Sequence, residues 1–318
     1  MSSPAELLKQ VRSRDRNVKA TAVEALLGAA RGSEGGGSLP SSSGDRAFIF
    51  KLAHDPSFAA REPAAQLLAQ LLAAALSGAD TDDADAAAHL LRRHSYSLGF
   101  ESREVAQLAP AVPLLVPMLL ASAGGHREAA GSLMNMAWRS TELAAVMVGA
   151  GAIPPLVQLL TNLNSTDMTT LENAAGALLN ILSHEDSAAA AAAAAEAGII
   201  KAVSERLLPQ GQNKWSRLGA KLLGCMVAAV RTADEEGRGH RVVVGQLVSS
   251  GAVAPLCSLA VAPPAAGPAR ETQALALQTL GLFGECDHAS LSASILDYPS
   301  LVTVLVGNLD PSRPSELR

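Results

Sequence analysis

Two groups of residues have the types that metal binding requires, but neither has the required spacing. His89 and His94 are five positions apart, so they cannot share one helix face as the histidines of a helical HExxH zinc motif do. The aspartates at positions 80, 82, 83 and 85 resemble the start of a calcium loop, but the loop glycine and the final glutamate are missing. We expect this acidic run to cap the start of a helix.

The sequence also offers no residue in the setting of a catalytic nucleophile. Cys225 lies in an apolar run, which is typical of a core thiol and not of an activated thiolate. The sequence contains no phosphate-binding GxxxxGK[ST] loop and no G-x-S-x-G elbow. We therefore expect no catalytic residues, no metal, no cofactor and no enzymatic activity.

The composition predicts the elements that must position any site. Hydrophobic residues make up 48% of the 318 positions and aromatic residues only 3%, with Ala and Leu dominant. Such a chain favours helices, since strands are enriched in β-branched and aromatic residues. The expected fold class is all-α.

The net charge and the cysteines indicate which partners and which cellular compartment to expect. A net charge of −5 argues against nucleic-acid binding, and we expect the basic stretch 9–19 to be a solvated helix face. Three cysteines without a CxxC pair indicate reduced thiols, and hence a cytoplasmic or nuclear protein. The uncharged runs 105–125 and 143–166 contain prolines or glycines that favour two short helices over a membrane span.

A repeated turn organises the chain. Gly151, Gly198 and Gly251 each precede an apolar helix, at separations of 47 and 53 residues. A glycine after a helix permits the left-handed conformation that ends it, and a proline is tolerated at the start of the next helix. The pattern predicts a steep turn between two helices at each glycine.

Each turn helix is followed by a long helical pattern and preceded by a short one. The long patterns cover 126–140, 169–183, 214–230 and 271–286; the short ones cover 140–150, 187–197 and 240–250. The predicted organisation is an N-terminal helix pair or cap at 1–31, a flexible Gly/Ser-rich insertion at 32–45, a repeat solenoid at 46–309 and a polar tail at 310–318. The last unit lacks a third helix, so the chain either ends in a polar cap or is a fragment of a longer array.

Residues 151–160, GAIPPLVQLL, and 172–182, ENAAGALLNIL, together resemble an armadillo repeat. The resemblance covers roughly residues 83–309. It implies a right-handed α-solenoid of about five to six three-helix units, whose third helices line a groove that holds extended peptides. In that family an asparagine near the end of the third helix often bonds the peptide backbone, and Asn135 and Asn180 match that position.

The alternative for both asparagines is a bond to a neighbouring turn, and the sequence leaves both open. Importin-α-type tryptophan slots are replaced by Gly131 and Gly176, so recognition of nuclear signals is not expected. Residues one and two helical turns from the asparagine position should face the same groove. The residues predicted to bind a partner there are Arg92, Arg93, Arg127, Glu128, Asn135, Glu172, Asn173, Asn180, Arg217, Lys221, Gln273 and Gln278. This set is mildly basic and would favour an acidic extended segment, unless its members only solvate the helices.

The resemblance implies a scaffold or adaptor that binds other proteins along the groove. Two alternatives stay open. One is a structural or assembly factor, such as a chaperone cofactor or a cytoskeletal or ciliary component; the other is an in-trans substrate-recognition module of a ubiquitin ligase. The sequence does not predict the oligomeric state.

Overall fold

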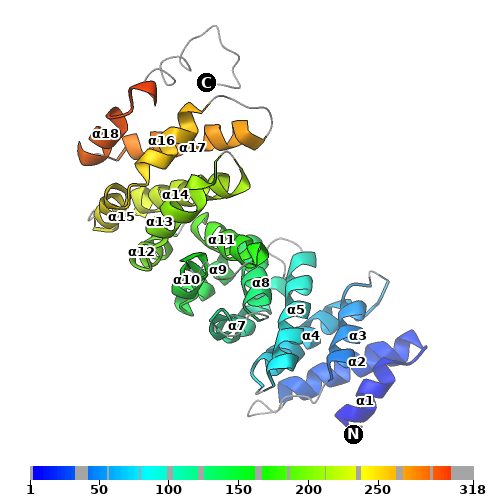
Figure 1. The fold of residues 1–318 in the computed structure, drawn as a ribbon. Coiled ribbons are helices and arrows are strands. Elements are labelled where there is room, and N and C mark those ends of the chain that lie inside the picture. The colour runs from blue at the N-terminus through cyan, green and yellow to red at the C-terminus, as the bar shows by residue number, and fades with distance from the viewer. Residues whose placement is uncertain are drawn as a thin grey trace. The chain divides into compact units, whose positions relative to one another are not determined.

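The computed structural model describes residues 3–32, 42–55, 57–78, 80–98, 103–120, 125–161, 167–184, 187–211, 213–233, 238–262, 268–286 and 289–301. Within these ranges every regular element is helical, which confirms the all-α prediction (Figure 1). The helices form two compact units, Met1–Ala152 and Ile153–Arg318. The sequence predicted one repeat solenoid at 46–309, and these bounds stay a prediction.

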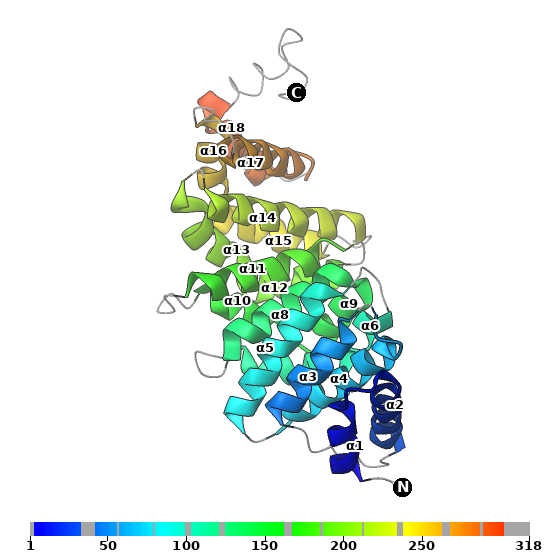
Figure 2. The same cartoon turned by 90° about the vertical axis from the view of Figure 1, so that its right-hand side faces the viewer.

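Unit 1 contains a helix pair, two three-helix repeats and the first helix of another. Its elements are α1 (Pro4–Val11), α2 (Arg16–Gly32), α3 (Ser43–Ala53), α4 (Arg61–Leu76), α5 (Thr81–Ser97), α6 (Arg103–Ala106), a 3₁₀ turn (Ala109–Ala111), α7 (Val112–Met118), α8 (Gly125–Arg139) and α9 (Thr141–Gly149). Helix α5 packs against α3, α4 and α8, and its long contact with α8 is visible from both directions (Figures 1 and 2). This contact joins the third helices of the two repeats.

Side-chain caps fix two helix starts in unit 1. Ser42 and Asp45 form a reciprocal capping box, so α3 begins at Ser43, inside the insertion that the sequence predicted at 32–45. Residues 33–41 of that insertion lie outside the described residues. The Asp80 carboxylate accepts hydrogen bonds from the main-chain nitrogens of Asp82 and Asp83, at 3.0 and 3.2 Å. The predicted capping role of this acidic run is thereby confirmed.

Unit 2 continues the repeat pattern. Its elements are α10 (Ile153–Thr161), α11 (Met168–Leu182), α12 (Ala188–Glu196), α13 (Ile199–Ala202), a π-helical segment (Val203–Leu207), a 3₁₀ turn (Leu208–Gln210), α14 (Lys214–Ala233), α15 (Arg238–Ser249), α16 (Val253–Val261), α17 (Pro268–Gly284) and α18 (Ala289–Leu296). Helix α14 packs on α11 and on α17, so third helices again contact one another. The predicted solenoid end and the tail 310–318 lie outside the described residues.

The turn glycines adopt the predicted conformation. Gly151, Gly198 and Gly251 have φ values of 74°, 86° and 69°. After α9, the nitrogen of Ala152 donates to Met147 O and that of Gly151 donates to Val148 O, both at 3.0 Å. This is the paired bonding of a Schellman cap, which satisfies carbonyls that the end of the helix leaves unpaired.

Two pairs of these helices are apolar enough to resemble a membrane span, but each is bent at a break. In unit 2 the axes of Val242–Ser249 and Val253–Val261 diverge by 71° at the Gly251 turn. No single helix in the described ranges is both long and apolar enough to cross a membrane.

Candidate functional site

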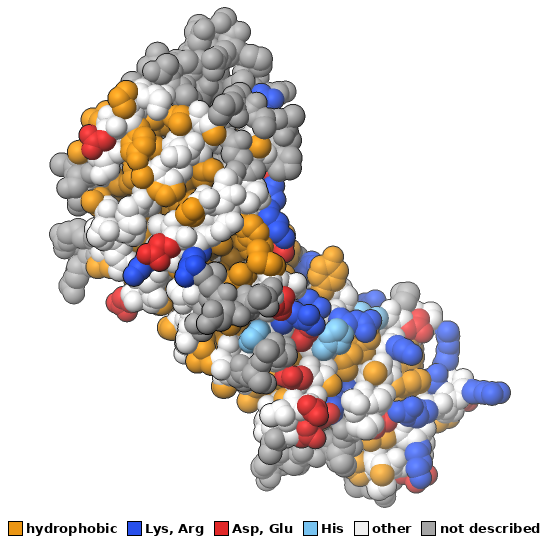
Figure 3. Space-filling model, in the orientation of Figure 1, with side chains coloured by type: hydrophobic (Ala, Val, Ile, Leu, Met, Phe, Trp, Pro, Cys, Tyr) orange, Lys and Arg blue, Asp and Glu red, His pale blue; other side chains and the backbone are white. Residues whose placement is uncertain are grey.

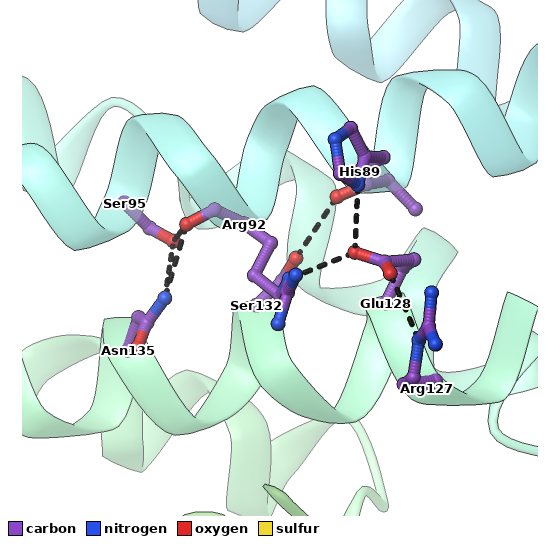
Figure 4. A network of polar contacts seen from close by, with 8 residues as sticks. His89, Arg92, Ser95, Arg127, Glu128, Ser132 and Asn135 are labelled. Carbon is purple, nitrogen blue, oxygen red and sulfur yellow. Dashed lines mark hydrogen bonds and ion pairs between the residues drawn. The ribbon is translucent and has the colours of Figure 1, made fainter. Parts of the chain in front are cut away.

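The parallel contact of α5 with α8 has a regular register. Three side chains of α8 donate to main-chain carbonyls of α5 that lie 43 or 44 residues earlier: Ser132 to Ala88 (3.3 Å), Asn135 to Arg92 (3.0 Å) and Arg139 to Tyr96 (2.9 Å). The offset is close to one repeat length, so equivalent positions of consecutive third helices lie side by side. Figure 4 shows the first two of these bonds.

Glu128 is the centre of a cluster of basic side chains in this contact. Its side chain is only 6% exposed, yet Arg92 Nε lies 2.8 Å from Oε2 and Arg127 Nε lies 3.1 Å from Oε1. His89 Nδ1 lies 3.2 Å from Oε2 (Figure 4). A buried carboxylate requires such pairing, because an unpaired charge is costly away from water.

Two further arginines, Arg93 and Arg139, lie on the same two helices. Arg93, the next residue after Arg92, holds its guanidinium carbon 5.0 Å from the centre of the Phe50 ring on α3, in a cation–π contact. Arg139 lies at the far end of the ladder of hydrogen bonds, on Tyr96 O. Figure 3 shows Lys and Arg side chains, with histidines among them, gathered over this part of unit 1. We call Arg92, Arg93, Arg127 and Arg139 the arginine cluster.

The N-terminal end of α5 carries acidic side chains. Burial, reinforced by the nearby charges of Asp82 and Glu128, raises the pKa of Asp85, and His126 partly offsets this. Acidic side chains thus gather at the N-terminal end of α5. Arg127 follows His126 at the start of α8, beside this acidic end, whereas Arg92, Arg93 and Arg139 lie further along the two helices.

The structure places the predicted asparagine of unit 1 inside the helix contact. Asn135 is 9% exposed, and its Nδ2 also lies 3.5 Å from Ser95 Oγ. Its amide donors are therefore directed at α5, which favours the alternative that this side chain bonds a neighbouring element. Its contact with a partner stays a prediction.

The predicted groove residues of unit 2 are mostly paired or buried. Lys214 Nζ lies 2.8 Å from Glu172 Oε2, and Arg217 pairs with Glu271, so opposite charges balance there. Lys221 and Gln278 are exposed, Asn180 is partly exposed and Asn173 is buried. These four stay predictions as partner contacts.

Gln273 differs from its predicted place on an open groove. It is 9% exposed, and its Nε2 donates to Ala260 O (2.8 Å) and to Ala262 O (3.0 Å). The side chain satisfies carbonyls at the end of α16, where no helical donor follows. Its amide therefore stabilises the α16–α17 connection instead of facing outward.

Cys257 is a buried thiol on α16. Burial raises the pKa of Cys257 to about 11, which keeps the thiol protonated. Among the described residues, no three side chains of His, Cys, Asp or Glu are grouped so that they could hold a metal ion.

Sequence reasoning missed three interactions in unit 1: His89 with Glu128, Ser132 with Ala88 and, between α3 and α5, His54 with His94. Each joins residues 39 to 44 positions apart. Applying the repeat spacing as a pairing rule, and not only as a helix rule, would have found them.

The sequence comparisons identify one repeat. Residues 140–183 match the armadillo/β-catenin-like repeat model, which covers the part of the chain that contains α9, α10 and α11. No curated protein matches the chain.

Solved structures share the fold over most of the chain. A designed armadillo repeat protein is 20% identical, with a TM-score of 0.55, over 88% of this chain and 99% of that one. Another, solved in complex with a (KR)4 peptide, is 21% identical with a TM-score of 0.54, over 89% and 100%. A third structure comes from a study of a phosphorylation switch that controls the interaction between cadherin and β-catenin. It is 14% identical with a TM-score of 0.58, and this chain spans 58% of its length. These likenesses establish an armadillo-type α-solenoid.

Proposed function

From an armadillo repeat at residues 140–183 and an armadillo-type fold, we propose that this chain is a non-catalytic scaffold that binds other proteins. We propose further that the arginine cluster on α5 and α8 binds an acidic, extended segment of the partner. The observation that carries this proposal is that two partly exposed arginines, Arg92 and Arg127, are held in place by the buried carboxylate of Glu128.

The geometry supports binding because the cluster is ordered before a partner arrives. Arg92 and Arg127 are held by Glu128, and Arg93 is held over Phe50. The side chains of Arg92 and Arg127 are nevertheless 32% and 49% exposed. Ordered guanidinium groups lose less conformational entropy on binding, and each can donate two bonds to a carboxylate.

The proposed partner segment has the opposite charge to the peptide in the structure of a designed armadillo repeat protein. That protein was solved with a (KR)4 peptide, which is strongly basic. A basic segment would be repelled by the arginine cluster, whereas an acidic one gains charge-assisted hydrogen bonds. The proposal therefore predicts opposite charge selectivity.

The test is fluorescence anisotropy with two labelled peptides, one alternating Glu and Ser and the other (KR)4. We expect the acidic peptide to bind and (KR)4 not to bind. The double variant Arg93→Gln with Arg127→Gln should weaken binding of the acidic peptide about fivefold, since each partly exposed charge contact contributes roughly 0.5 kcal/mol.

A matched control separates a local effect from a change of net charge. Lys201→Gln with Arg206→Gln removes the same charge from exposed positions of unit 2 and should leave the affinity within about twofold. Equal weakening by the two double variants, or preferential binding of (KR)4, would contradict the proposal.

A further inference from the structure

Two histidines meet between α3 and α5 of unit 1, away from Glu128. His94 is 1% exposed, and its Nδ1 lies 3.4 Å from His54 Nε2. The ring centres are 5.1 Å apart and the ring planes are nearly perpendicular, at 87°. Phe50 packs on both rings, so the pair lies in an apolar contact between the two helices.

The hydrogen bonds define which nitrogens carry protons. His54 Nδ1 lies 2.8 Å from the carbonyl oxygen of Phe50, which only accepts, so this nitrogen carries hydrogen. In the neutral ring, His54 Nε2 is then the acceptor for His94 Nδ1–H. His94 Nε2 is left as a buried lone pair with no partner in the described part of the chain.

Proton uptake by His94 disrupts this arrangement. A proton on His94 Nε2 creates a buried, charged donor that has no acceptor in the described part of the chain. The contact is therefore favourable only while His94 is neutral.

The charges on α3 and α5 near the pair do not compensate a proton. On α3, Lys51 lies one turn before His54, and Asp55 follows it. The Asp55 carboxylate accepts bonds from the nitrogen and hydroxyl of Ser57, at 2.9 and 2.6 Å. On α5, Arg93 adds a positive charge over Phe50.

The other two helices that pack on α5 each carry one carboxylate, and neither forms an ion pair with these rings. On α4 it is Glu62, next to Arg61 in the first turn. On α8 it is Glu128, which pairs with His89, Arg92 and Arg127. From α8, Arg139 reaches the carbonyl of Tyr96, two residues beyond His94. Among the described residues, neither ring forms an ion pair with Asp or Glu; the histidine that does is His89.

We propose that the His54–His94 contact is a proton-sensitive latch that holds α3 on α5 at neutral pH and opens more often in mild acid. Burial, with a smaller effect of His54, lowers the pKa of His94 from 6.5 to about 3 in the folded chain. The open state therefore binds a proton that the latched state does not. Stability from the latch is complete above pH 6.5 and declines as the pH falls toward 3.

The test is hydrogen–deuterium exchange of the full chain, with rates corrected for intrinsic exchange. The internal reference is α16, which contains no histidine, Asp or Glu. Between about pH 7.5 and 5.5, the opening constant of α3 should rise about tenfold relative to α16, as uptake of one proton with an unfolded-state pKa of 6.5 requires. Equal protection of α3 at the two pH values would overturn the proposal.

Variants assign the effect to the pair. His94→Leu should reduce the tenfold change to less than about twofold, whereas His126→Gln, at a partly exposed histidine of α8, should retain it. Retention of the tenfold change in His94→Leu would overturn the proposal. If His94→Leu does not fold, histidine ¹⁵N NMR of the unaltered chain decides: His94 should stay neutral at pH 5.5, and titration of the folded chain near 6.5 would overturn the latch.

Discussion

Glu128 has two opposing effects at the residue scale. Its carboxylate stabilises unit 1 by pairing with Arg92 and Arg127, which would otherwise repel each other across the α5–α8 contact. The same carboxylate lowers the positive potential that an acidic segment would encounter. Stability and affinity therefore depend on this side chain with opposite signs.

Glu128→Gln separates the two effects. Loss of the buried charge should destabilise the chain by about 2 kcal/mol, below the usual cost of breaking a buried pair because both arginines reach water. The affinity for the acidic peptide should rise about threefold. Glu172→Gln, which removes an exposed partner of Lys214, should change the stability by less than about 0.5 kcal/mol.

Urea unfolding and peptide anisotropy measured on the same preparations give both quantities. A Glu128→Gln chain that loses affinity while it remains folded would show that the carboxylate itself contacts the partner.

At the scale of elements, the turn glycines decide where helices end. Gly151 has φ of 74°, and a Cβ built on it meets no atom within 4 Å, so only backbone strain opposes a side chain there. Gly149, two residues earlier, also has open space around its Cβ position but is helical. Because neither position is crowded, comparing substitutions at the two glycines measures the effect of backbone conformation separately from that of side-chain packing.

Gly151→Ala should therefore lower the free energy of unfolding by about 1 kcal/mol, because alanine is strained in the left-handed region. Gly149→Ala should raise it by about 0.5 kcal/mol, because alanine loses less backbone entropy in a helix. The check is the urea midpoint of each variant against the unaltered chain. Shifts of the same sign would show that packing, and not φ, controls both sites.

The same contrast between local and distant effects explains which features the sequence predicted. The glycine turns and the Asp80 cap depend on residues within one helical turn, so type and spacing were sufficient to predict them. The pairing of Arg92 with Glu128, the inward placement of Gln273 and the meeting of His54 with His94 depend on how helices pack across a repeat. A projection along one helix carries no information about that register.

At the scale of the whole molecule, local and net charge have opposite signs. The chain carries a net charge of −5, so an acidic peptide is repelled at long range. The arginine cluster acts only over short distances, within the screening length of about 10 Å at 0.1 M salt. Salt weakens both the repulsion by the net charge and the attraction by the arginine cluster. Whether the affinity for the peptide falls or rises with salt therefore shows which of the two dominates in the complex.

If the acidic peptide binds at the arginine cluster, its affinity should fall about fivefold between about 0.1 and 1 M NaCl, where the screening length shrinks to about 3 Å. The Arg93→Gln, Arg127→Gln double variant should lose less than about twofold over the same range, because the contacts that salt weakens are largely absent. Sodium sulfate would also strengthen apolar burial, so NaCl titration by anisotropy is the cleaner measurement. An affinity of the unaltered chain that rises with salt would mean that net charge governs the encounter and that the peptide does not occupy the cluster.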